Sequence, residues 1–163
     1  MAWLRLIRFP NLLIVALTQV LLHQSVLVPI LQAQGAPITL APLHLTLLIV
    51  GTMLAAASGY VINDLIDYEI DRINKPKRVL IGTKIPFSTA RLFFALLHLL
   101  GFAISSYLAF HIQKPYAIAF YPLAAFALWA YSQRLKQMTL VGNVVVSLFC
   151  AGVAGILLFA ERE

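Results

Sequence analysis

Residues 44–71 read HLTLLIVGTMLAAASGYVINDLIDYEID, an apolar segment that runs directly into a cluster of carboxylates. The first 19 residues of this stretch contain no Asp, Glu, Lys or Arg, and about 20 apolar residues are enough for a helix to cross a bilayer. Four of the protein's six acidic residues then occur within eight positions. We therefore predict a membrane-spanning helix over 44–62 whose end carries a concentrated negative charge.

The acidic residues of this stretch are spaced to share one helix face. Asp64 and Asp67 are three residues apart, Asp67 and Asp71 are four apart, and Asn63 lies one turn before Asp67. Such intervals place side chains next to each other on an α-helix. Because neighbouring like charges repel, a bound divalent cation would stabilise the cluster. An all-oxygen ligand set favours magnesium or calcium over zinc, and magnesium often bridges carboxylates to phosphates. The pattern therefore indicates a diphosphate held through metal.

The alternative interpretation of the same stretch is a solvated helix end. In that case its acidic side chains pair with the basic residues that follow directly, which are Arg72, Lys75, Lys77 and Arg78.

The rest of the chain repeats the apolar pattern. It is 61% hydrophobic and 11% charged over 163 residues, with a mean hydropathy of +0.90, and soluble domains rarely carry so little charge. We predict an all-α fold, a polytopic transmembrane helix bundle of about five spans that forms a single domain over 1–163. The segments expected to cross the membrane are 11–31, 44–62, 92–111, 116–131 and 141–160.

Basic residues lie in the gaps between these segments. Six of them fall between Arg72 and Arg91, and Arg5 and Arg8 precede the first span. By the positive-inside rule the amino terminus and the 63–91 region are cytoplasmic, in a protein of the cell inner membrane. Five spans then place the last residues, Arg162 and Glu163, outside. This distribution accounts for the net charge of +6 without nucleic acid, which would require basic residues spread over a soluble face.

Isolated polar residues in the spans are expected to serve packing. Those of the first span should face the bundle interior; they are Gln19, His23, Gln24 and Ser25. The single cysteine, Cys150, lies in an apolar run and is expected to be a small buried residue. The four histidines are scattered without metal-ligand spacing, so packing or interfacial roles are expected for them.

A bilayer location adds a hydrophobic tail to the predicted diphosphate ligand. A polyisoprenyl diphosphate meets both demands, because its tail suits a helix bundle and its head group suits metal at the membrane surface. The matching chemistry is ionisation, in which metal and basic groups stabilise the leaving diphosphate while an acceptor attacks the allylic carbocation.

The motif Asn63-Asp64-x-x-Asp67-x-x-x-Asp71 resembles the first aspartate-rich motif of the UbiA-type membrane prenyltransferases, which lies at the end of their second transmembrane helix. The basic segment 72–78 continues the resemblance. Tyr131-Ser132 with Lys136, then Gly142-Asn143, is similar to the family's segment between helices four and five.

This resemblance implies roles for particular residues. The residues implied in catalysis are Asp64, Asp67 and Tyr131. Magnesium, two ions in a complete site, would be held by Asn63, Asp64, Asp67 and Asp71. The diphosphate would contact Asn63, Lys77, Arg78 and Lys136, and Asn11 would line the cavity.

The chain also departs from the family pattern. Family members have about nine helices and a second aspartate-rich motif, whereas no aspartate follows Asp71 here, so the bundle is incomplete relative to the nine-helix family fold. Three accounts are open: a truncated, inactive product, a fragment completed by a second chain, or a reduced version that completes itself by self-association.

The leading functional hypothesis is transfer of a polyprenyl group from prenyl diphosphate to a lipophilic acceptor of aromatic, haem or glycerophosphate type. The loop 73–80 favours the glycerophosphate type, because it resembles that of digeranylgeranylglyceryl phosphate synthases. One alternative is a non-catalytic membrane scaffold, or a truncated remnant, that keeps a metal- or headgroup-binding cluster. Another is a small transporter or channel, which should carry charges near the middle of its spans and inverted repeats.

Overall fold

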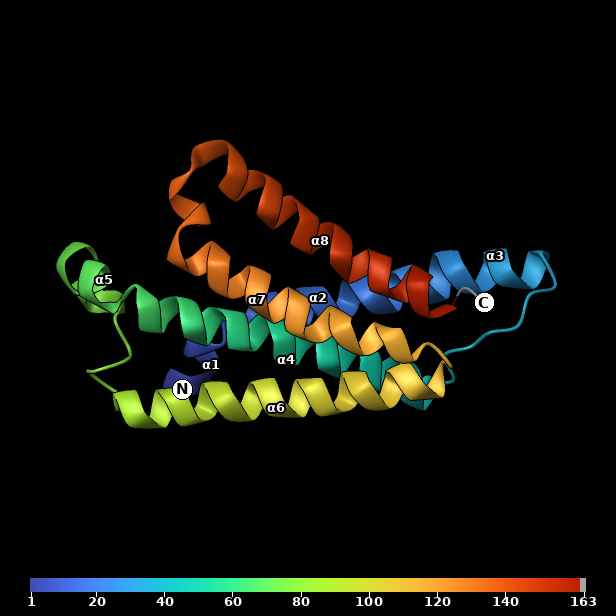
Figure 1. Ribbon diagram of the computed structural model, residues 1–163, viewed down its shortest axis with the longest axis horizontal. Helices are drawn as coiled ribbons and strands as arrows, with labels where there is room; N and C mark the ends of the chain where they lie inside the picture. Colours follow the sequence, from blue (N-terminus) through green and yellow to red (C-terminus); the bar gives the residue numbers. More distant parts are fainter. Residues whose placement is uncertain (162–163) are drawn as a thin grey trace.

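The computed structural model describes residues 1–161, apart from the side chain of Thr139, so Arg162 and Glu163 lie outside the described residues. Within 1–161 the regular elements are helices and no strand is formed. The long helices lie side by side along the longest axis of the molecule (Figure 1). The predicted class, an all-α polytopic helix bundle, is confirmed.

The first half of the chain forms two long helical rods. The first rod consists of α2 (Phe9–Leu22), the π-helical turn η1 (His23–Leu27) and α3 (Val28–Ala33), and the short helix α1 (Ala2–Leu6) precedes it. The second rod is α4 (Pro42–Ile66), which begins at a proline. Proline is favoured in the first turn because its missing N–H would have no partner there.

In the second half of the chain, proline again lies at the start of several helical segments. After α5 (Tyr68–Asn74) come the 3-10 turn η2 (Pro76–Arg78) and α6 (Phe87–His111), whose N-cap is Pro86. The 3-10 segment η3 (Pro115–Ala119) leads into α7 (Phe120–Gln133), and the 3-10 turn η4 (Leu135–Gln137) leads into α8 (Thr139–Glu161).

Four helical stretches within 1–161 are long and apolar enough to cross a bilayer: Phe9–Ala33, Pro42–Ile66, Phe87–His111 and Leu140–Glu161. The protein is therefore an integral membrane protein. The segment predicted as a further span, 116–131, is divided between η3 and the 14-residue α7, and its crossing of the membrane stays a prediction.

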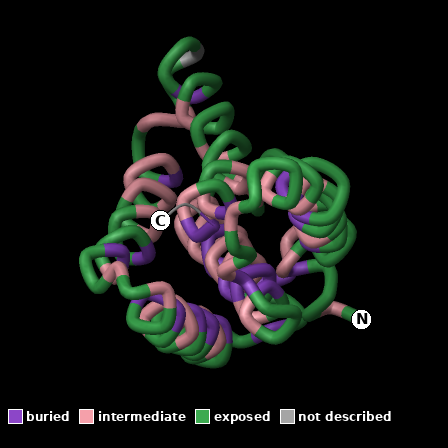
Figure 2. Tube along the Cα trace, turned by 90° about the vertical axis from the view of Figure 1, so that its right-hand side faces the viewer, coloured by how far each residue is buried: buried purple, intermediate pink, exposed green. Residues whose placement is uncertain are grey.

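Helix α4 lies at the centre of the bundle. It packs most extensively on α6 and also contacts α7 and α2. The end-on view shows that buried positions gather on the inner sides of the helices (Figure 2). Small residues allow the close approach: a Cβ at Gly51 would lie 3.5 Å from both Ile104 and Ser105 of α6. Such small-residue contacts are typical of helix pairs in membranes.

A buried carboxylate ties the carboxyl end of α8 to two other segments. Glu161 Oε1 lies 2.7 Å from His23 Nε2 and accepts the Leu40 N–H at 3.2 Å, while Oε2 accepts the Thr39 N–H at 2.8 Å. The side chains of His23 and Glu161 are only 3% and 2% exposed. We call these four residues the Glu161 clamp. It joins α8 to η1 and to the connection between α3 and α4.

Two expectations about individual residues are wrong. Gln19 and His23 are buried as predicted, but Gln24 and Ser25 are exposed, because among the described residues the first rod packs mainly on α4 and α8 and leaves its other side uncovered. Cys150 is exposed and not buried, since α8 contacts α2 and η4 and leaves its Cys150 side uncovered.

Candidate functional site

The acidic residues sit at a bend between two helices. Helix α4 ends at Ile66 and α5 begins at Tyr68, with Asp67 at φ −80° and ψ −3°. The Asp67 N–H donates to the Asn63 carbonyl at 2.9 Å, and the Asp71 N–H donates to the Asp67 carbonyl at 2.8 Å. Helical spacing therefore continues across the bend. We call Asn63, Asp64, Asp67 and Asp71 the acidic cluster.

Lys136 of η4 reaches into the cluster from the connection between α7 and α8. Its Nζ contacts Asp67 Oδ1 and lies 3.3 Å from Asn63 Oδ1, while Asn63 Nδ2 donates to Asp67 Oδ2 at 3.0 Å. The Lys136 and Asp67 side chains are 20% and 18% exposed, so the pair is partly shielded from water. Two oxygens from different residues thus converge on one positive charge.

Arg8 is a second cation at the cluster, and sequence reasoning did not include it. Its Nη2 lies 3.3 Å from Asp64 Oδ1, and its guanidinium stacks 4.6 Å from the centre of the Tyr60 ring. Arg8 has a left-handed backbone, φ 50°, at the N-cap of α2. Asn11 follows and donates to Tyr60 Oη at 3.4 Å. The only sequence signal for Arg8 was its position before the first span.

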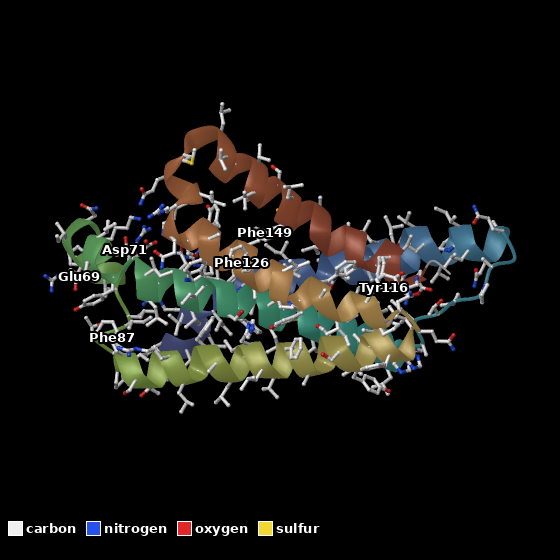
Figure 3. All side chains as sticks on the ribbon, viewed as in Figure 1. Glu69, Asp71, Phe87, Tyr116, Phe126 and Phe149 are labelled. Atoms are coloured by element: carbon white, nitrogen blue, oxygen red, sulfur yellow. The ribbon has the colours of Figure 1, made fainter. Side chains whose placement is uncertain are left out.

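The last two acidic residues of the stretch form ion pairs with basic residues three or four positions later in the sequence. Glu69 binds Arg72 at 3.0 Å, and Asp71 binds Lys75 at 3.7 Å. Figure 3 shows Asp71 on the inner side of α5, toward α4, and Glu69 on its outer side. The solvated-helix interpretation therefore fits Glu69, which is 70% exposed, better than Asp67.

The other predicted site residues make fewer contacts. Lys77 and Arg78 are exposed in η2, and their side chains make no ion pair within residues 1–161. Tyr131 is half-buried in the last turn of α7 and forms no side-chain hydrogen bond to any described residue. The structure thus joins Lys136 to Asn63 and Asp67 but does not bring Lys77, Arg78 or Tyr131 into contact with them.

The donor atoms suit a hard cation. They are carboxylate and amide oxygens, the ligand type that magnesium prefers, and the bound ammonium of Lys136 marks a point where positive charge is stabilised between Asn63 and Asp67. In the part of the chain that the structure describes, no three His, Cys, Asp or Glu side chains are gathered as metal ligands. The oxygens therefore fit such an ion chemically, with Lys136 and Arg8 now occupying part of their coordinating capacity.

An apolar groove lies along the middle of α4, beside residues 48–56. It has a volume of about 580 Å³ and is formed by α4 with α6, α7 and α8. At one end is Leu128 of α7, whose methyl groups would lie 3.1 Å from a Cβ at Gly59, one helical turn before Asn63. The structure thus places a cluster of paired charges at one end of α4 and an apolar groove along its middle.

Comparison with known proteins identifies the family of this chain. The profile of the UbiA prenyltransferase family matches residues 24–160. The chain belongs to the UbiA prenyltransferase family.

Two relatives that carry the same name illustrate the similarity. The digeranylgeranylglyceryl phosphate synthase of Sulfurisphaera tokodaii is 39% identical over 112 residues, 69% of this chain and 38% of the relative. The protein of the same name from Methanoculleus marisnigri is 33% identical over 152 residues, 93% of this chain and 49% of the relative. A solved structure from work on the biosynthesis of digeranylgeranylglyceryl phosphate synthase in membranes superposes on this chain with a TM-score of 0.79. The two sequences are 27% identical, and the match covers 99% of this chain and 53% of the other. The chain thus spans about half the length of these proteins, or less.

Proposed function

We propose that this chain provides the diphosphate-binding part of a membrane prenyltransferase that transfers a polyprenyl group to a glycerophosphate-type lipid. The observation that carries the proposal is the convergence of Lys136, Asn63 and Asp67 at the end of a membrane-spanning helix. Oxygens that already hold one cation can hold a metal ion, and the lysine can move to a phosphate oxygen. The relatives' shared name supports the choice of acceptor.

Each side chain has a stated task in this proposal. Asn63, Asp64, Asp67 and Asp71 would hold magnesium, which when bound supplies positive charge that neutralises the diphosphate. Lys136 and Arg8 contact the anion directly, and Lys77 and Arg78 are available to it from the adjoining loop. Tyr131 and Asn11 would line the path by which the prenyl diphosphate reaches the cluster, Tyr131 on the side of α7 and Asn11 beside Tyr60.

The reaction is a substitution at the allylic carbon. The bond between C1 and the diphosphate oxygen breaks, and the diphosphate leaves with the electron pair. The acceptor hydroxyl oxygen then bonds to C1, and its proton passes to the released diphosphate or to water. Cationic side chains aimed at the leaving group stabilise the charge that develops on it.

We further propose that the amino terminus and the 63–91 region are cytoplasmic. Every described basic residue except Lys114 lies in the amino-terminal segment, in the 63–91 region or between α7 and α8, all at the end of the bundle that carries the cluster, as the positive-inside rule requires. In a Cys150→Ser background, a cysteine at Thr83 should react with an impermeant maleimide only from the cytoplasmic side. A cysteine at Gln34 should react only from the other side, and the reverse pattern would contradict this orientation.

Transfer itself is proposed for an assembly larger than residues 1–163. The matching proteins are longer, and the further helices come from the same polypeptide, from a second copy or from another protein. Light scattering of the purified chain in detergent distinguishes self-association from the other two cases.

The test of the proposed function is magnesium-dependent binding of geranylgeranyl diphosphate to the purified chain in detergent. We expect Asp67→Asn to weaken binding about a hundredfold, because a carboxylate at the centre of the site is lost. The matched control is Glu69→Gln, which removes a charge two residues away on the outer side of α5 and should leave the affinity unchanged.

Equal affinity of the Asp67→Asn and wild-type proteins would overturn the proposal. Binding that needs Asp67, in an assembly that transfers no prenyl group, would instead favour the non-catalytic scaffold.

A further inference from the structure

Three aromatic side chains meet at the end of the bundle opposite the acidic cluster. His44 lies in the first turn of α4, and Tyr107 and His111 lie in the last two turns of α6. The start of α4 and the end of α6 lie together at the end of the molecule away from α5 (Figure 1). Tyr107 and His111 are four residues apart and therefore share one face of α6. We call His44, Tyr107 and His111 the histidine cluster.

The two imidazole rings of the histidine cluster are stacked face to face. Their centroids are 3.4 Å apart, and their planes are 11° from parallel. The Tyr107 ring is nearly parallel to both, with its centroid 6.1 Å from that of His44 and 6.2 Å from that of His111. The Tyr107 hydroxyl lies 3.4 Å from Nε2 of His44. Two helices thus bring two imidazoles and one hydroxyl group into contact.

One nitrogen of His44 has no hydrogen-bond partner among the described residues. This atom is Nδ1, and it is buried, whereas Nε2 faces the Tyr107 hydroxyl. The tautomer that donates from Nε2 to the Tyr107 oxygen carries its lone pair on Nδ1. A buried polar atom without a partner is costly, and an unrecorded ion is one explanation for it. A histidine that donates a hydrogen bond from one nitrogen and presents a lone pair on the other has the form that binds metal.

The spacing of the rings suits a shared metal ion. Two nitrogens that bind one tetrahedral zinc ion at about 2.0–2.1 Å lie roughly 3.3 Å apart, and the two rings are 3.4 Å apart. A rotation of each ring about χ2 turns the lone pairs toward a common point between the ring edges. His111 is exposed and forms no side-chain hydrogen bond to any described residue, so its rotation breaks none.

The ligand type separates the histidine cluster from the acidic cluster. Imidazole nitrogen suits zinc, nickel and copper, whereas carboxylate and amide oxygens suit magnesium. The basic residue nearest to His111 in the sequence is Lys114, whose Nζ donates to the Phe159 carbonyl at 2.7 Å, so its charge is directed toward α8. Two histidines leave coordination positions open, and water completes them, as in zinc sites with fewer than four protein ligands.

We propose that His44 and His111 bind a divalent cation of the zinc, nickel or copper class, and that this ion links the start of α4 to the end of α6. Tyr107 is a positioning residue, whose hydroxyl fixes the tautomer and the ring orientation of His44. The site is separate from the acidic cluster and does not depend on the proposed function. Its two histidines belong to different helices, so no spacing in the sequence indicates it.

The test is zinc binding to the purified chain in detergent, measured by isothermal titration above neutral pH, where imidazole is uncharged. The protein carries no histidine tag. Every variant also carries Cys150→Ser, because the exposed Cys150 thiol is itself of a type that binds zinc. Thermal unfolding is recorded with and without zinc, since an ion that binds only the folded state raises the unfolding temperature.

We expect His44→Gln and His111→Gln each to weaken zinc binding about a hundredfold, because loss of a hydrogen-bond partner of a metal ligand alone typically costs about 10–100-fold. Tyr107→Phe keeps the ring and should weaken zinc binding about tenfold. The rise in unfolding temperature with zinc should disappear in both glutamine variants. His111→Cys replaces one zinc ligand with another and should restore binding relative to His111→Gln.

The matched control is His98→Gln. His98 of α6 also has a buried Nδ1 without a partner among the described residues, but its ring contacts Phe94 and Tyr121 and not a second histidine. This variant should therefore bind zinc as the parent protein does. Asp67→Asn should also leave the zinc affinity unchanged, because Asp67 belongs to the acidic cluster at the other end of α4.

Three results would overturn the inference. Zinc affinity that is the same in the parent protein and in a folded double variant His44→Gln/His111→Gln would leave the two rings as packing groups only. A loss in His98→Gln as large as that in His111→Gln would show that zinc responds to a general disturbance of α6. Loss of zinc binding in Asp67→Asn would assign the ion to the acidic cluster.

Discussion

Each end of the bundle has carboxylates paired with nitrogen groups, but the pairs at the two ends differ in their exposure to water. At the acidic cluster, Asp64 and Arg8 are 27% and 45% exposed, and Asp67 and Lys136 are 18% and 20% exposed. At the Glu161 clamp, His23 and Glu161 are 3% and 2% exposed. A carboxylate that remains within reach of water can exchange its partner for a ligand, whereas one enclosed by protein cannot.

Hydrogen bonding widens this difference. Glu161 is bound by a ring nitrogen of His23 in η1 and by the adjacent backbone N–H groups of Thr39 and Leu40, which compensates for its removal from water. Asp64 is held by Arg8 alone among the described residues. The burial of Glu161 favours a structural role for the clamp, whereas a binding role is what we propose for the cluster, and the following variants test that distinction.

The largest effect is expected from Glu161→Ala. It leaves His23 and the N–H groups of Thr39 and Leu40 without their acceptor in a buried place, so the free energy of unfolding should fall by about 3–5 kcal/mol. Denaturant unfolding in detergent micelles measures this change. The control is Glu69→Ala at the exposed pair, and similar losses for the two variants would contradict the structural role of the clamp.

A smaller effect, on binding and not on folding, is expected from Lys136→Met. The variant removes the cation that Asn63 and Asp67 share, and loss of its contact with phosphate should weaken prenyl diphosphate binding about tenfold. Isothermal titration measures the affinity, and Lys75→Met is the control, because Lys75 pairs with Asp71 at the longer distance of 3.7 Å. If Lys136→Met lowered the stability of the fold but left the affinity for prenyl diphosphate unchanged, the acidic cluster would have a structural role and not the binding role proposed for it.

The variant His23→Gln tests how much the imidazole ring contributes to the stability of the clamp. The glutamine amide can still donate to Glu161 but differs in shape from the imidazole ring, so the loss of stability should be about 1 kcal/mol, that of a hydrogen bond altered and not abolished. The same unfolding measurement applies. A loss as large as that of Glu161→Ala would mean that the imidazole itself, through charge or shape, holds the clamp.

The smallest effect is expected from Arg72→Ala. Its pair with Glu69 is 56% and 70% exposed, and exposed ion pairs contribute about 0–1 kcal/mol. Unfolding and prenyl diphosphate binding should both stay close to wild type. A clear loss of binding would extend the site to the outer side of α5.

Sequence reasoning was most effective where the information was local. The acidic cluster was predicted from intervals of three and four residues, and the backbone keeps that spacing across the bend at Asp67. Lys136 was chosen by resemblance to a family motif, and it reaches Asp67 from 69 residues away. Arg8 was overlooked as a site residue, because nothing in its neighbours indicates that it meets Asp64 56 residues later.

Errors arose where exposure depended on neighbouring helices. Gln24 and Ser25 were expected to face the bundle interior because they are polar residues within a span, and Cys150 was expected to be buried because it lies in an apolar run. All three lie on faces that no described helix covers. Hydropathy identifies a helix that can enter the membrane, but it does not identify which of its faces meets protein.

The sequence by itself determined the helical membrane class, the carboxylates on one helix face and the prolines at which several helices begin, because these follow from composition and from contacts within one or two turns. Only the tertiary structure decided that His23 meets Glu161 across 138 residues, that Arg8 and Lys136 converge on the cluster, and that α8 leaves an open groove beside α7. These features depend on how whole helices pack, and packing is set by the summed shape of many side chains that lie far apart along the chain.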